Sequence, residues 1–233
     1  MHYSFDWSIP FQPPYLGWLV RGAVLTMALA AATTVTSLAV GTAVCLGRFS
    51  ARAWMRRLCA LYIEVTRNVP GLFWILFFYF VFPDILPHVL GDPLGRYAHF
   101  SIVASVLALT VDNSPYVAEI LYSGVQAVPS GQWEASAATG LSSAQQWWSV
   151  IFPQAARMSA GPLGTRVIHN FKNTSLCMVI ATPELTWATQ QIQSLTFRGL
   201  EATTVATVFY VTVSLTLAGL FSVLESRVDW SNT

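Results

Sequence analysis

Long apolar stretches alternate with short polar segments along most of this chain. A helix needs about 20 predominantly apolar residues to cross a bilayer. Because a backbone in lipid must satisfy its own hydrogen bonds, such stretches favour helices. Five stretches are long enough, at approximately residues 17–46, 58–83, 99–125, 161–182 and 202–224. The pattern predicts an all-α integral membrane protein with five transmembrane helices and a single domain over residues 1–233.

The uneven distribution of basic residues predicts the orientation. Arg48, Arg52, Arg56 and Arg57 directly follow the first stretch. Cytoplasmic loops carry an excess of lysine and arginine. We therefore expect the N-terminus outside, the C-terminus in the cytoplasm, and the loop 126–160 on the cytoplasmic side. The outer side then holds only Arg21, Arg96 and Arg198. The first twenty residues lack the basic n-region and the cleavage site of a signal peptide.

Composition agrees with a membrane protein and narrows the functions. Apolar residues make up 54% of the chain and charged residues 10%. The net charge of +1 lacks the basic excess of a nucleic-acid-binding protein. The single lysine, Lys172, is followed by Asn173, so the GxxxxGK[ST] loop that binds ATP phosphates is absent from the sequence. We expect no cofactor in this chain and no ATP hydrolysis by it.

Cysteine and histidine residues offer no metal site or catalytic centre. Cys45, Cys59 and Cys177 lie in or beside apolar stretches, where a free cysteine behaves as a small hydrophobic residue. The four histidines are not spaced as metal ligands, and the sequence contains no evident nucleophile–base arrangement. An intramembrane enzyme is therefore not expected.

The loop 126–160 contains the most informative motif. Glu134-Ala135-Ser136 is followed by three residues and Gly140, and after nine more residues by Val150-Ile151-Phe152-Pro153. Small side chains let a partner surface approach closely, and an acidic residue near a helix start is favoured by the helix dipole. Glycine can leave a helix with a positive φ, and proline restricts the segment that follows. This pattern predicts a rigid surface element that transmits movement from a bound partner.

The motif resembles the EAA loop of the membrane subunits of ABC importers, with the pattern E-A-A, three residues, G, nine residues, I-x-L-P. Ser136, Val150 and Phe152 are conservative departures from it. The resemblance implies that this loop touches a separate ATPase. The coupling residues that it implies are Glu134, Ala135, Ser136, Gly140 and Pro153.

Further motifs resemble the permease subunits for polar amino acids, the histidine/glutamine/glutamate group. They are G-x-x-x-T at 22–26, Y-x-x-x-x-R-x-x-P at 62–70, the run 116–134 that leads into the loop, and K-N-T-S-L at 172–176. The opening 3–8 resembles the glutamate/aspartate branch. Tyr122 stands where the family usually has arginine, and Asn173 stands where it has aspartate.

This resemblance implies a five-helix type I ABC importer subunit in a bacterial inner membrane. It implies two ATPase subunits that bind ATP and Mg²⁺, a second like or identical permease subunit, and a soluble periplasmic amino-acid-binding protein. Glutamate or aspartate is the first expected substrate, ahead of glutamine, histidine or basic amino acids. A stand-alone channel or secondary transporter would favour inverted repeats, which the sequence lacks, and would leave the EAA spacing unexplained.

Charged residues within the apolar stretches are functional candidates, because an unpaired charge in a bilayer is costly. We expect Arg67 to pair with Glu119, with a substrate-carboxylate role for Arg67 as the alternative. Asp112 and Asn113 interrupt the third stretch and are candidates for the substrate path, where Asp112 would meet an ammonium group. The alternative for Asp112 is hydrogen bonding within the helix bundle.

The fourth stretch is too polar to face lipid, so we expect it to line a pore or to pack centrally. Its candidates for the substrate path are Arg166, His169, Asn170 and Asn173. Arg166 and Lys172 could meet an anionic substrate, or could reach towards water at the cytoplasmic end. Gln190, Gln191 and Gln193 in the outer loop 183–200 could meet the binding protein or simply form a solvated face.

Overall fold

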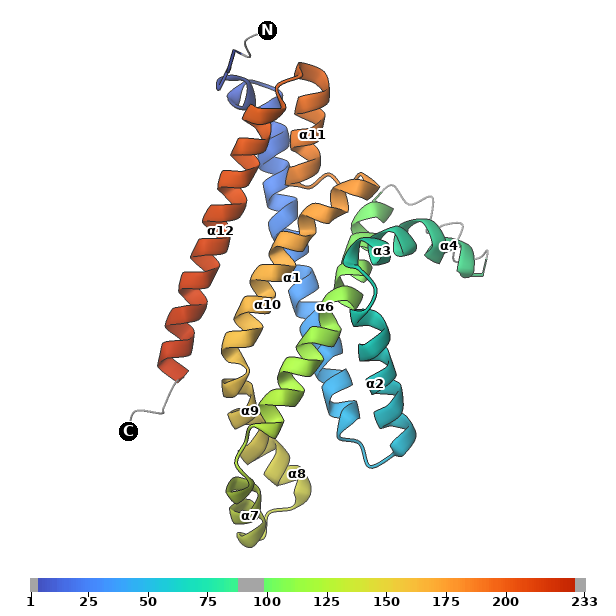
Figure 1. The fold of residues 1–233 in the computed structure, drawn as a ribbon, viewed down its shortest axis with the longest axis vertical. Coiled ribbons are helices and arrows are strands. Elements are labelled where there is room, and N and C mark those ends of the chain that lie inside the picture. The colour runs from blue at the N-terminus through green and yellow to red at the C-terminus, as the bar shows by residue number, and fades with distance from the viewer. Residues whose placement is uncertain (1–3, 88–98, 229–233) are drawn as a thin grey trace.

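A computed structural model describes residues 4–87 and 99–228, with side chains as far as Ser226. Arg96, and Tyr3 of the opening motif, lie outside the described residues. Within the described residues the chain forms helices and no β-strand (Figure 1). The all-helical fold predicted from the sequence is therefore confirmed.

Among the described residues, three helices are long and apolar enough to cross a membrane by themselves. They are α1 (Tyr15–Arg48), α6 (Phe100–Gln126) and α12 (Gly199–Val228), and they correspond to the first, third and fifth predicted spans. α1 and α6 cross in the middle of the molecule and pack along much of their length (Figure 1). Large apolar side chains of α12 such as Val211 and Leu215 are exposed, as expected of a surface that faces lipid.

The second predicted span, 58–83, is not one continuous helix. The chain forms α2 (Ala53–Arg67), α3 (Gly71–Leu76), the π-helix η2 (Phe77–Val81) and α4 (Phe82–Ile85). α2 and the segment after Pro70 meet at an angle of 101°. Pro70 has no N–H, so it cannot donate to the carbonyl of Thr66. The indole N–H of Trp74 donates to that carbonyl instead, at 3.4 Å, which stabilises the bend.

The fourth predicted span, 161–182, also differs from a simple apolar helix. It consists of α10 (Ala160–Asn173) and the 3₁₀ helix η4 (Thr174–Ile180). Ala181 then adopts a positive φ of 54°, and α11 (Leu185–Thr196) follows in the predicted outer loop. By length and hydropathy, the described residues contain three membrane-crossing helices, or four if the bent pair is one span. α10, with 14 residues, is too short to qualify by itself.

The loop 126–160 folds into short helices at the end of the molecule opposite to the N-terminus (Figure 1). They are α7 (Ser130–Ala138), α8 (Ser143–Gln145), the π-helix η3 (Gln146–Ile151) and α9 (Phe152–Met158). Ser142 begins α8 with a reciprocal capping box to Gln145. Both π-helices end directly before a Phe-Pro pair, where a proline could not donate the regular helical hydrogen bond.

The opposite end is closed by the N-terminal segment, which includes the 3₁₀ helix η1 (Ile9–Phe11), together with α11 and the start of α12. Glu184 begins α11 and is fully buried. Its carboxylate accepts hydrogen bonds from the backbone N–H groups of Thr186 and Trp187 at 2.9 and 2.8 Å and from the hydroxyl of Tyr210 at 3.0 Å. Glu184 therefore joins α11 to α12 at this end.

Candidate functional site

One face of α6 carries polar and aromatic side chains towards α10. Asp112, Tyr116, Glu119 and Ser123 are spaced by four, three and four residues, so they lie on the same side of the helix. A cavity of about 680 Å³ opens beside the lower part of this face, between α6, α9 and α10. Its lining includes Arg67, Tyr116, Glu119, Ser159, Arg166 and His169.

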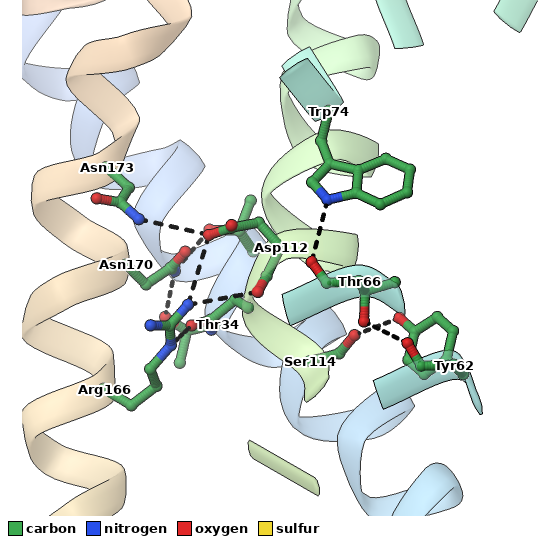
Figure 2. A network of polar contacts seen from close by, with 11 residues as sticks. Thr34, Tyr62, Thr66, Trp74, Asp112, Ser114, Arg166, Asn170 and Asn173 are labelled. Carbon is green, nitrogen blue, oxygen red and sulfur yellow. Dashed lines mark hydrogen bonds and ion pairs between the residues drawn. The ribbon is translucent and has the colours of Figure 1, made fainter. Parts of the chain in front are cut away.

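Arg166 lies at the inner wall of this cavity and is held from several directions. Its guanidinium forms an ion pair with Asp112 at 3.4 Å and donates to the side-chain oxygen of Asn113. The same group lies 3.9 Å from the centre of the Tyr116 ring, a cation–π contact. Arg166 therefore points into the bundle towards α6 rather than towards water at a helix end (Figure 2).

Asp112 is enclosed on its other sides. Its carboxylate also accepts a hydrogen bond from Asn173 at 3.4 Å, as Figure 2 shows. Gly71, the first residue of α3, packs against it so closely that an added Cβ would lie 2.9 Å from the Asp112 Oδ1 atom. The bend after Pro70 thus brings a helix start against a buried carboxylate, where only glycine fits without a shift.

Asn170 faces away from the cavity, although the sequence made it a candidate for the substrate path. Its side-chain amide donates to the hydroxyls of Thr33 and Thr34 on α1, at 2.8 and 3.0 Å, and only 1% of the residue is exposed. His169, one position earlier, is exposed and lines the cavity. Arg166 and His169 are therefore the predicted path residues that reach the cavity, while Asp112, Asn113 and Asn173 lie behind them and do not line it.

A second set of charges lies nearer to the arginine-rich end of the molecule. This end is where α1 finishes and α2 begins, and it carries Arg48, Arg52, Arg56 and Arg57. Glu119 contacts Arg67 at 3.5 Å, the partner expected from the sequence, and it also accepts a short hydrogen bond from Arg48 at the end of α1. The Arg48 guanidinium lies 3.6 Å from the centre of the Tyr122 ring. Arg48 was not predicted from the sequence as a partner of Glu119. Tyr122, where the family usually has arginine, was the available signal, because its ring accommodates a cation that comes from another helix.

The EAA motif lies on the outer surface of the short helices. Glu134 and Ala135 are exposed on α7, while Ser136 is buried and donates to the carbonyl of Trp133 at 2.9 Å. Gly140 has a φ of +76° and would have no atom within 4 Å of an added Cβ. Glycine is therefore favoured at this position by its backbone conformation and not by crowding. Pro153 is exposed in the first turn of α9.

A row of aromatic rings connects the EAA motif to the membrane helices. Trp133 of α7 contacts Trp147 with ring centres 5.5 Å apart, and Trp147 contacts Phe49 at 4.9 Å. Phe49 stacks on Tyr122 of α6, also at 4.9 Å. Rings at these separations attract one another beyond the area that they bury. The row packs α7 against the end of α1 and against α6, which the sequence pattern did not reveal.

Comparison with known proteins decides what kind of membrane protein carries this site. The family described as "Binding-protein-dependent transport system inner membrane component" matches residues 39–230. The chain belongs to this family. The prediction of an ABC importer permease subunit, made from the motifs, is therefore confirmed.

Similar proteins support the same placement over nearly the full length of this permease. It is 32% identical over 226 residues to the glutamine transport system permease protein GlnP of Escherichia coli (strain K12), with coverage of 97% of this chain and 98% of that protein. It is 29% identical over 225 residues to the glutamate/aspartate import permease protein GltK of Escherichia coli O157:H7, with coverage of 97% and 99%.

A solved structure agrees with the fold. The crystal structure of an amino acid ABC transporter with histidines matches with a TM-score of 0.84 and 28% identity, and covers 97% of this chain and 100% of that chain. The names of the similar proteins differ in the amino acid that they mention, so the family assignment does not fix a substrate.

Proposed function

We propose that this permease forms half of the membrane pore of an ATP-driven importer of polar amino acids, with glutamate or aspartate as substrate. The observation that carries the proposal is the cavity of about 680 Å³ with charges of both signs in its lining. Its volume lies within the range of about 300–1,000 Å³ that is usual for small-molecule sites. An amino acid presents one ammonium group and at least one carboxylate, and it needs partners for both.

The lining offers both kinds of partner, in two adjoining pairs. Glu119 contacts Arg67, and the ring of Tyr116 lies against Arg166. Arg166 and Arg67 provide guanidinium groups for carboxylates, and His169 adds an exposed imidazole. Glu119 and the ring of Tyr116 suit an ammonium group. Cationic groups outnumber carboxylates in this lining, which favours a substrate with a second carboxylate.

Asp112 takes a different role from the one expected of a direct ammonium partner. It stands behind Arg166 and fixes the direction of that guanidinium. We infer that Asp112, Asn113 and Asn173 are positioning residues, and that Arg166 and His169 meet the substrate. Asn170 is a tie to α1 and is left out of the substrate path.

Energy would enter through the EAA loop. We infer that an ATPase subunit binds the surface around Glu134, Ala135, Ser136 and Gly140, and that the aromatic row passes its movement to α1 and α6. Two such ATPase subunits would bind ATP and Mg²⁺, and this chain would hydrolyse none. The arginine-rich end is then cytoplasmic, and a periplasmic binding protein would deliver substrate at the end that contains Glu184.

A second permease subunit, like or identical, completes the proposal. The cavity is open to the outside and is lined by residues of α2, α6, α9 and α10, and a partner subunit over its opening would enclose a path that one chain only half lines. The assembly would reside in a bacterial inner membrane. Glutamine is the second candidate substrate, favoured by the 32% identity to a glutamine permease; in that case the guanidinium groups would serve the α-carboxylate alone.

The test is ATP hydrolysis by the reconstituted complex, stimulated by its binding protein and screened against the twenty amino acids. Stimulation by glutamate or aspartate would support the full proposal. Stimulation by glutamine, histidine or a basic amino acid would support an ATP-driven amino-acid importer but exclude glutamate and aspartate as its substrates. A chain that transports with no stoichiometric ATPase attached would contradict the importer itself.

A further inference from the structure

A second hollow lies at the arginine-rich end, away from the cavity described above. It measures about 330 Å³ and lies where the end of α1, the start of α2 and α6 meet. Its lining consists of Arg48, Ala53, Arg56, Arg57, Ala60 and Tyr122. Two alanines at the α2 surface leave room, and three arginines supply positive charge around it.

The positive charges of this hollow are not balanced by carboxylates among the described residues of its own lining. Arg56 donates to the carbonyls of Ser50 and Ala51, at 2.9 and 3.0 Å, which fixes its guanidinium at the rim. Arg57 forms no hydrogen bond or ion pair within the part of the chain that the structure describes. Arg48 is held by Glu119 and Tyr122, and no carboxylate is among the described residues that line the hollow.

The start of α2 adds to the positive potential. α2 begins at Ala53 with no acidic residue in its first turn and with no side-chain cap. The unpaired N–H groups of a helix start carry a partial positive charge. Together with the three arginines, this makes the hollow complementary to a compact anion such as a phosphate ester.

The neighbouring face of α2 indicates the source of that anion. Trp54, Leu58, Leu61 and Val65 are exposed and spaced by four, three and four residues, so they form one apolar stripe. Arg57 borders this stripe at the helical period of 3.6 residues, whereas Ala60 and Arg56 point further round α2. A stripe of this kind suits a surface that faces lipid, so a phosphate held at Arg57 would have the acyl chains of its own lipid beside α2.

We propose that this hollow binds the phosphate headgroup of an anionic phospholipid from the leaflet at the arginine-rich end. Basic residues near an anionic leaflet attract such lipids. The simpler account is that these arginines only set the orientation of the chain, which requires positive charge on one side but no shaped hollow. The two accounts differ in what controls lipid retention. In the proposal it depends on the position of each arginine and on the open volume of the hollow, and in the simpler account it depends on charge alone.

The experiment measures lipid retained by the protein, purified with its partner subunits from nanodiscs that contain equal parts of phosphatidylglycerol and phosphatidylcholine. Native mass spectrometry gives the ratio of the two retained lipids. We expect Arg57→Gln to lower the preference for phosphatidylglycerol about fivefold, which corresponds to ~1 kcal/mol for the loss of one direct hydrogen bond to the phosphate. Ala60→Leu fills the hollow without a change of charge, and we expect it to lower the preference by a similar factor.

Arg52→Gln is the matched control, because Arg52 is an exposed arginine of the same segment that does not line the hollow. It should leave the preference nearly unchanged. Equal losses in Arg52→Gln and Arg57→Gln, or no effect of Ala60→Leu, would overturn the proposal in favour of general surface charge. Displacement of the lipid by millimolar inorganic phosphate would assign the hollow to a soluble anion. Loss of the ATPase from Arg57→Gln with lipid retention unchanged would assign it to a protein contact.

Discussion

Arg166 of α10 and Asp112 of α6 form an ion pair of 3.4 Å, with only 14% and 12% of their side-chain surfaces exposed. The pair joins two helices that are far apart in the sequence, and it fixes a guanidinium at the wall of the cavity. A charge at this depth is tolerated because its partner, Asn113 and the Tyr116 ring all contact it. The ion pair is thus both a structural tie and the means by which the cavity obtains an oriented cation.

Removal of one partner should destabilise the protein more than removal of both. Asp112→Asn leaves the Arg166 guanidinium buried without its counter-charge, and we expect a loss of about 3 kcal/mol in the free energy of unfolding. The double variant Asp112→Asn with Arg166→Gln should recover part of that loss. Asp84→Asn, at an exposed carboxylate of α4, is the control and should change stability by less than about 0.5 kcal/mol. Unfolding is followed in detergent, and a double variant no more stable than Asp112→Asn would contradict the coupling.

Substitutions of the adjacent residues His169 and Asn170 should affect different properties. The change at Asn170 should lower stability, and the change at His169 should lower transport. Asn170→Ala removes the amide that donates to the buried hydroxyl of Thr33 and to the half-buried hydroxyl of Thr34, and we expect a loss of about 2 kcal/mol of stability. His169→Ala removes an exposed side chain, so stability should change little while uptake into proteoliposomes falls severalfold through a higher KM. If His169→Ala transports normally, the residue does not meet the substrate.

The backbone at Gly140 should be needed for coupling. Gly140→Ala places a side chain at a φ of +76°, at a cost of about 1–2 kcal/mol. We expect the turn after α7 to shift, and binding-protein-stimulated ATP hydrolysis to fall while the complex still assembles. Gly131→Ala in α7, where an added Cβ also meets nothing within 4 Å but φ is not positive, is the control. Equal activity of the two variants would show that the conformation at Gly140 does not matter for coupling.

The aromatic row should keep the EAA loop in place. Trp147→Ala removes two ring contacts, each worth about 0.5–1.5 kcal/mol, so local opening of α7 to α9 should become easier. Trp148→Ala, at a neighbouring tryptophan that is 60% exposed, should have a smaller effect. Limited proteolysis within 130–158 measures the opening. Faster cleavage in Trp148→Ala than in Trp147→Ala would contradict the proposed link.

The hydropathy of the sequence predicted most of the long helices, because the stability of a helix in lipid depends on its own residues. A run of about 20 apolar residues is stable in lipid only as a helix, whatever surrounds it. α1, α6 and α12 follow this rule directly. The bend after Arg67 was not predicted, even though Pro70 marks the place, because a proline shows where a helix is weakened but not the angle at which the chain continues. That angle depends on how α3 packs against α6, including the contact between Gly71 and Asp112.

The sequence by itself determined the class of the protein, the three long apolar helices and the motif of the EAA loop, since these depend on residue type and on short spacings. Only the tertiary structure decided which polar residues face the cavity. Arg48 and Glu119 are 71 positions apart, and Asn170 and Thr33 are 137 apart. Contacts of this kind follow from the crossing of α1, α6 and α10. A helical period of 3.6 residues shows which side chains share a face, but it does not show which neighbour that face will meet.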